Sequence, residues 1–113
     1  AVRGRQVFVA GMIGWDAHGQ FQSDDLVAQV RQALANAVEV LAEAGARPEH
    51  IVRMTWYVID KQEYLGAIRE VGAAYRELIG KHYPAMAVVQ VVGLMEDEAR
   101  LEIETTAVIP EAP

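Results

Sequence analysis

The spacing of apolar residues changes its period along this chain, and this change restricts the possible folds more than any other feature. Between residues 26 and 41 apolar side chains recur every three or four positions, which is typical of an amphipathic helix. Between residues 51 and 59 they alternate, which is typical of a strand with one buried face. A chain with both periods is predicted to pack helices against a sheet, so we expect an α+β fold.

Six elements are predicted in the order strand, helix, strand, helix, strand, strand. The four strands are predicted at residues 7–14, 51–59, 87–92 and 101–109. The first helix is expected to take a cap from residues 23–25 and to end at Gly45, where glycine can adopt a left-handed conformation. Asp60 and Glu63 have the spacing of a capping box, and the second helix is predicted to run from there to Gly80.

The length of the chain limits it to a single domain. With 113 residues, 52% of them hydrophobic, it can build one core and has no room for a second. We expect residues 1–113 to form a mixed sheet with two helices packed on one face. The strand around residues 88–92 is apolar on both sides, so the other sheet face also needs a cover. Because the chain has no further element to supply it, self-association is predicted.

The composition excludes several classes of function. The formal net charge is -6, from 16 acidic and 10 basic residues, and no basic cluster offsets it, so nucleic acid is not an expected partner. The chain contains no cysteine, which fits a reducing compartment. It shows no signal-peptide pattern and no apolar run near the roughly 20 residues of a membrane span. We expect a cytoplasmic protein without a membrane partner or a cofactor, and the three histidines lack the spacing of a metal site.

Six short segments carry a more specific signal. They are residues 7–11, 29–36, 41–45, 51–55, 82–89 and 101–104. Residues 29–36 contain the pattern Gln-x-x-x-x-Leu-x-Asn, and residues 101–104 read Leu-Glu-Ile-Glu. In this order and spacing, the segments resemble the RidA/YjgF family of imine and enamine deaminases. The resemblance implies a chorismate-mutase-like α+β fold and a homotrimer with three clefts between its subunits.

The resemblance also implies a set of site residues. Glu102 corresponds to a glutamate that is thought to position the attacking water or to carry its proton, so it is the expected catalytic residue. Ala10 stands where the family has a serine, and Gly11 follows it. Met86 stands where the family has an arginine that grips the substrate carboxylate, and Ala87 follows it. A thioether cannot form that ion pair, so Met86 is expected to line the ligand cleft and to contribute packing only.

Three further residues have both a structural and a functional interpretation. Trp15 is expected in the core or at an interface, and the alternative is a stacking platform in the ligand cleft. His82 can titrate near physiological pH, but a lone histidine on a loop is expected to be a solvent-facing structural residue. Ser23 is better explained as a helix cap than as a nucleophile.

Two functions remain open at this point. The first is a hydrolytic deaminase in which Glu102 activates water and an apolar cleft around Met86 selects an enamine or imine other than a simple 2-imino acid. The second is a non-catalytic trimer that binds a metabolite or a partner protein in the same clefts. Since charged hydrogen bonds contribute about 1.5–3 kcal/mol, small 2-imino acids are poor ligands in either case.

Overall fold

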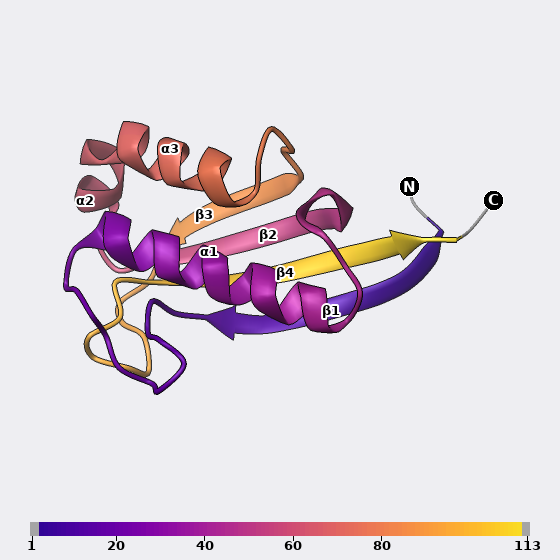
Figure 1. The fold of residues 1–113 in the computed structure, drawn as a ribbon. Coiled ribbons are helices and arrows are strands. Elements are labelled where there is room, and N and C mark those ends of the chain that lie inside the picture. Colours follow the sequence, from indigo (N-terminus) through magenta and orange to yellow (C-terminus); the bar gives the residue numbers. More distant parts are fainter. Residues whose placement is uncertain (1–2, 112–113) are drawn as a thin grey trace.

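The computed structural model describes residues 3–111 as a four-stranded sheet covered by helices (Figure 1). The strands are β1 (Gly4–Met12), β2 (Ile51–Val58), β3 (Ala85–Gln90) and β4 (Leu101–Pro110), and the helices are α1 (Leu26–Glu43), α2 (Lys61–Gly66), α3 (Ile68–Leu78) and a short 3-10 helix, η1 (Pro48–His50). The strand order is β1-β4-β2-β3, with β2 and β3 parallel and the other pairs antiparallel. The predicted α+β class and mixed sheet are confirmed.

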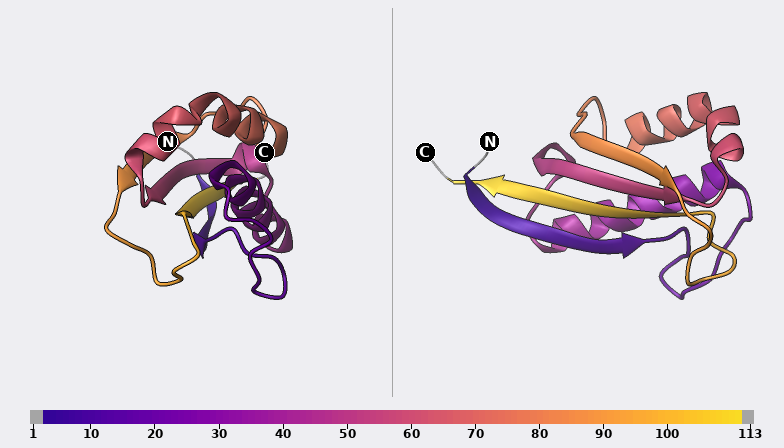
Figure 2. Two further views of the ribbon diagram at one scale, coloured as in Figure 1. Left: turned by 90° about the vertical axis from the view of Figure 1, so that its left-hand side faces the viewer. Right: turned by 180° about the vertical axis from the view of Figure 1, so that it is seen from behind.

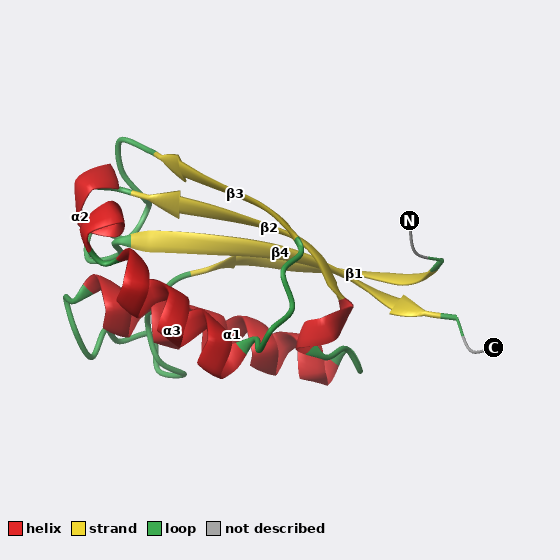
Figure 3. Cartoon of the chain, turned by 90° about the horizontal axis from the view of Figure 1, so that it is seen from above, coloured by secondary structure: helices red, strands yellow, loops and turns green. Residues whose placement is uncertain are grey.

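All three α-helices lie on one side of the sheet (Figures 2 and 3). The core fills the space between them and contains the large side chains of Leu34 from α1, Trp56 from β2 and Ile103 from β4, each at most 2% exposed. Such burial is the main source of stability for a domain of this size. None of the helices within residues 3–111 has both the length and the apolar character that a membrane span requires.

The predicted helix ends agree with the structure at three positions. Asp25 caps α1, since its carboxylate accepts a hydrogen bond from the N–H of Ala28 at 3.0 Å. Gly45 and Gly80 follow α1 and α3 with φ angles of 81° and 90°. These left-handed conformations favour glycine, which explains why both helices stop there.

The second predicted helix is in fact divided in two. The backbone leaves helical geometry at Ala67, with φ -111° and ψ 16°, between α2 and α3. Gly66 is a weak helix former, and the break follows it directly. Only half of the predicted capping box forms, because Asp60 accepts from the N–H of Glu63 while the Glu63 carboxylate lies 2.9 Å from Arg100.

The third strand begins and ends two residues earlier than predicted. Its pairing with β2 stops at the pair Val58 and Gln90, because β2 itself ends there. Val92 lies beyond the sheet and is fully exposed. The strand was predicted to reach Val92 because this residue is apolar, but apolar character does not show where the neighbouring strand ends.

The sheet face opposite the helices carries no cover among the described residues (Figure 2). Phe8 on this face is 72% exposed, and Val89 is 43% exposed. Polar residues of β2 and β4 lie between them, including Arg53 and Glu104. We call this surface the open face.

Candidate functional site

An irregularity in β1 shapes one end of the open face. The pairing of β1 with β4 shifts between Val9 and Met12. As a result, Ala10 and Gly11 lie opposite a single β4 residue, Glu104. A bulge of this kind bends a strand and turns its side chains in new directions, and bulges are frequent beside functional sites.

Gly11 and Glu102 lie against each other at this bulge. A Cβ atom at position 11 would be only 2.6 Å from Cδ of Glu102, so the absence of a side chain at Gly11 leaves the space that the carboxylate occupies. Glu102 is half-buried in β4. The structure therefore brings together two of the residues that the sequence placed in one cleft.

A tyrosine joins the carboxylates on the same face. The Tyr57 hydroxyl donates a hydrogen bond of 2.6 Å to Oε1 of Glu104. This hydrogen bond is the main cause that raises the pKa of Tyr57 above its usual value, and the negative charges of Glu104 and Glu102 act in the same direction. With its pKa raised, Tyr57 keeps its hydroxyl proton and donates a hydrogen bond beside the carboxylates of Glu102 and Glu104.

The alternating pattern of residues 51–59 puts Tyr57 on the strand face opposite Trp56, but it does not predict this contact. Glu104 is 47 positions away in the chain. Only the register between β2 and β4 brings the two side chains together, and alternation within one strand does not report register.

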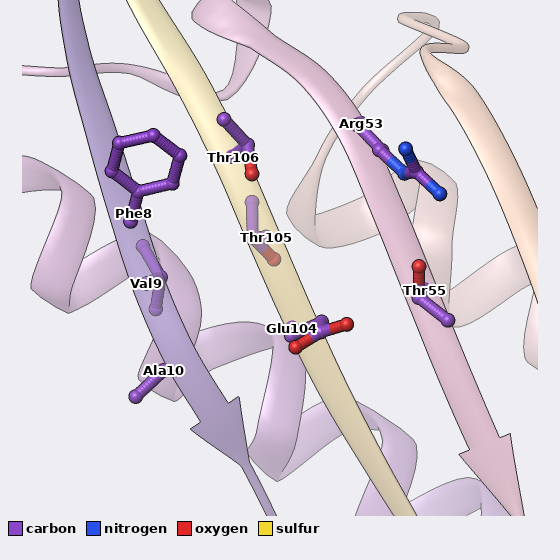
Figure 4. Close-up of a pocket in the computed structure, with 8 residues that line it drawn as sticks. All are labelled: Phe8, Val9, Ala10, Arg53, Thr55, Glu104, Thr105 and Thr106. Atoms are coloured by element: carbon purple, nitrogen blue, oxygen red, sulfur yellow. The ribbon is translucent and has the colours of Figure 1, made fainter.

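A shallow hollow of about 300 Å³ lies beside these carboxylates (Figure 4). It is lined by Phe8, Val9, Ala10, Arg53, Thr55, Glu104, Thr105 and Thr106, which come from β1, β4 and β2. Arg53 and Glu104 place one positive and one negative charge at its border, with the apolar ring of Phe8 on the opposite side (Figure 4). The open face can therefore offer polar and apolar contacts to the same small molecule.

Met86 lies in a different hollow, on the helix side of the sheet. This hollow has a volume of about 220 Å³ and is lined by Trp56, Tyr64, Ile68, Val71, Gly72, Tyr75, Arg76, Tyr83 and Met86. Glu102 belongs to the open face, so within one chain it and Met86 are on opposite faces of the sheet. A single subunit does not bring them into one cleft.

The remaining predicted cleft residues are also separated. Ala87 is exposed on β3 and pairs with Thr55, which places it at the open face on the far side of β2 from Glu102. Trp15 is half-buried near the start of the segment between β1 and α1, with its ring centroid 6.0 Å from that of Phe21. It does not line either of the two hollows described above.

The prediction for His82 is wrong, since the residue is not a solvent-facing loop histidine. Its ring is half-buried, and Nε2 donates a 2.6 Å hydrogen bond to the carbonyl oxygen of Ile51. His82 therefore fastens the segment before β3 to the start of β2. Ser23 is not the cap of α1, since Asp25 has that role; the Ser23 hydroxyl accepts from the N–H of Asp25 and holds the residue that caps the helix.

The Gln-x-x-x-x-Leu-x-Asn pattern is structural as well. Gln29 is 1% exposed, and its amide oxygen accepts from the N–H of Arg100 at 2.8 Å. Asn36 donates to the carbonyl oxygens of Ile13 and Trp15 at 3.1 and 2.9 Å. These bonds connect α1 to the segment after β1 and to the segment before β4, and they satisfy polar groups that would otherwise be buried without partners.

No group of three potential metal ligands is present among residues 3–111. On the open face, the carboxylates of Glu102 and Glu104 can accept hydrogen bonds or protons from a bound small molecule or from water, and Arg53 can donate hydrogen bonds.

Comparisons with known proteins agree with this fold. The 2-iminobutanoate/2-iminopropanoate deaminase of Homo sapiens is 30% identical over 105 residues, which cover 92% of this chain and 73% of the human protein. The solved structure of YyfB from Yersinia pestis, of the conserved Rid protein family, has a TM-score of 0.81 with 38% identity, covering 94% of this chain and 80% of that one. E. coli TdcF with bound serine has a TM-score of 0.80 with 30% identity, covering 94% and 82%.

The sequence also matches a family model over nearly its whole length. The match covers residues 1–109, and the model is described as Endoribonuclease L-PSP. This family includes the YjgF/RidA proteins, and one structure similar to this chain is that of the YjgF gene product from E. coli. The chain therefore belongs to the Endoribonuclease L-PSP family, also known as the YjgF/RidA family.

Proposed function

We propose that this protein is a homotrimer that hydrolyses an imine or enamine in clefts between its subunits, with Glu102 as the group that activates water. The observation that carries the proposal is the placement of Glu102 against Gly11, half-buried beside an uncovered sheet face. The deaminase activity in the name of the human relative and the serine bound to TdcF support a small-molecule site.

Assembly is part of the proposal because Glu102 and Met86 lie on opposite faces of the sheet within one subunit. Phe8 and Val89 expose apolar surface on the open face, and burying such surface favours association. A cleft that contains both Glu102 and Met86 needs Glu102 from one subunit and Met86 from its neighbour. Closed rings of identical subunits create repeated contacts of this heterologous kind.

The proposed reaction needs only water and the carboxylate. Glu102 accepts a proton from water as the water oxygen forms a bond to the imine carbon. The proton then passes to the nitrogen, which gives a carbinolamine. The hydroxyl proton of the carbinolamine next moves to the nitrogen by way of Glu102, and as the carbon–oxygen double bond forms the carbon–nitrogen bond breaks, so a carbonyl compound and ammonia leave. A half-buried carboxylate suits this work, because partial removal from water strengthens its hydrogen bond to the bound water. An enamine reaches the same path after it tautomerises to the imine.

Met86 restricts the substrate. Its thioether offers packing and no positive charge, so a small 2-imino acid lacks a partner for its carboxylate at this position. We therefore propose an imine or enamine in which the carboxylate is distant from the carbon–nitrogen bond or absent.

The test is ammonia release from freshly generated imines that differ in the position of their carboxylate, with 2-iminopropanoate included. Glu102→Gln is expected to lower turnover about 100-fold or more, which is the usual contribution of a positioned acid–base group. Glu96→Gln, in the exposed loop before β4, is the matched control and should retain full activity. A Glu102→Gln variant as active as the parent contradicts the proposal.

The second candidate is a trimer that binds a metabolite or a partner protein without turnover, and the replacement of the family arginine by Met86 favours it. Met86→Arg distinguishes the two functions on 2-iminopropanoate. If the catalytic site is intact, the variant should gain turnover over the parent. Saturable ligand binding without product from any imine, in both proteins, would support the second candidate.

A further inference from the structure

The hollow on the helix side of the sheet has the walls of an aromatic binding pocket. Trp56 is 2% exposed and forms an edge-to-face pair with Tyr64 at 6.5 Å between ring centroids. Tyr75 and Tyr83 are stacked on each other with centroids 5.8 Å apart and ring planes 18° apart. Stacked and edge-to-face rings hold each other in place, so the pocket of about 220 Å³ is bordered by mutually packed walls.

One buried polar group of this pocket has no partner. The indole Nε1 of Trp56 is buried and forms no hydrogen bond with any side chain or backbone group among residues 3–111. An unpaired buried N–H group destabilises a protein unless something else accepts its hydrogen bond. Because the Nε1 atom exposes less than 1 Å² of its surface, Trp56 contributes its ring and not its N–H group to the pocket.

One positive charge also borders the pocket. Arg76 lines it from α3, and a Cβ atom at Gly72, one turn earlier, would be 3.3 Å from Nη1 of Arg76. The missing side chain at Gly72 thus leaves room for the guanidinium over this part of the helix. Among the described residues, Arg76 takes part in no ion pair and its side chain makes no hydrogen bond.

We infer that this pocket binds a small carboxylate with an aromatic or branched apolar body, and that Arg76 holds the carboxylate. The planar guanidinium can donate two parallel hydrogen bonds to a carboxylate. The apolar body then lies against the tyrosines and Met86, whose flexible thioether adapts to its shape. Arg76 on α3 thus supplies the positive charge of the pocket, and Met86 on β3 supplies apolar contacts.

This inference deepens the proposed function, and its catalytic part rests on that function. If Glu102 of a neighbouring subunit acts at the cleft, the substrate is an imine or enamine with its carboxylate separated from the carbon–nitrogen bond by an apolar spacer. The binding part does not depend on turnover, so it can be measured alone.

The test compares 3-phenylpropanoate with its uncharged amide, 3-phenylpropanamide, by NMR titration of the full chain. The parent is expected to bind the acid about tenfold more tightly than the amide, the lower end of what a charged hydrogen bond contributes, because Arg76 is at the exposed rim. Arg76→Met should remove this preference while leaving amide binding unchanged. Arg69→Met, on the same helix but outside the pocket, should keep it.

Three results would overturn the inference: equal affinity of the parent for acid and amide, an acid preference that persists in Arg76→Met, or no saturable binding of either compound. Since Arg76 is exposed, the variant is expected to fold, and circular dichroism checks this. Acid binding through Arg76 without hydrolysis of any imine would support the pocket and contradict the catalytic function. Hydrolysis of neutral imines without acid binding would support the catalytic function and contradict the pocket.

Discussion

The two faces of the sheet differ in whether contacts within a single subunit cover their side chains. On the covered face, β4 presents Leu101 and Ile103 to the helices, and both are fully buried. On the open face, the same strand presents Glu102 and Glu104 beside the exposed ring of Phe8. Alternation along one strand therefore separates residues that hold this subunit together from residues available to other molecules. The following predictions test that separation.

The largest effect is expected from a core substitution on β4. Leu101→Ala should lower the free energy of unfolding by about 2–5 kcal/mol, because it leaves a cavity among well-packed side chains. Thr106→Ala, on the open face of the same strand, should change it by no more than about 0.5 kcal/mol. Urea unfolding at one fixed protein concentration measures both. Equal losses would show that the faces do not differ in this way.

The second prediction concerns assembly. Phe8→Asp places a charge on the open face, where the proposed trimer would bury the Phe8 ring. The substitution should weaken the trimer by about 2 kcal/mol or more for each buried ring. Sedimentation velocity at low micromolar concentration would detect this as smaller particles.

The control for Phe8→Asp is Leu65→Asp, because Leu65 is 52% exposed on α2 and lies away from the open face. This variant should sediment like the parent. A parent that is already monomeric would remove the proposed intersubunit cleft altogether.

The third prediction concerns the bulge. Gly11→Ala should displace the Glu102 carboxylate and lower the free energy of unfolding by about 1–3 kcal/mol, because the new methyl group overlaps that side chain. Gly93→Ala is the control, since no atom lies within 4 Å of its added methyl group and its φ is not positive. Thermal unfolding compares them, and equal stability of Gly11→Ala and the parent would contradict the contact with Glu102.

The smallest effect is expected from Tyr57. Its pKa is raised in the folded protein, so the contribution to stability is complete below the usual tyrosine pKa of about 10 and is lost as the pH rises through the folded value. Tyr57→Phe should therefore show a slightly smaller loss of stability above pH 10 than the parent. Glu104→Gln should lower the Tyr57 pKa in an ultraviolet titration, and an unchanged titration curve would exclude the hydrogen bond as its cause.

The sequence predicted features that depend on neighbouring residues. Gly45 and Gly80 end their helices as expected, because a left-handed residue is a local requirement. The period-two pattern of β2 correctly separated the buried Trp56 from Tyr57, and the order of six segments led to the family. These are properties of short stretches of chain, and reading a sequence recovers them.

Features that depend on distant partners could not be predicted in the same way. His82 finds its acceptor 31 positions away at Ile51, and Tyr57 finds Glu104 only through the strand register. The strand alternation alone did not show that Met86 points to the helix side while Glu102 points to the open face. The strand of Met86 has little polar contrast, so its facing relative to Glu102 needed the sheet order and the register with β2.

The position of β4 in the sheet affects how the chain can fold during its synthesis on the ribosome. β4 lies between β1 and β2, yet it follows both in the chain, and the pair Gly4 and Pro110 joins residues more than one hundred positions apart. Until β4 has been synthesised and has left the exit tunnel, β1 and β2 have no shared neighbour. The sheet therefore closes only after nearly all of the described chain is available, and such long-range pairing is slow compared with helix formation.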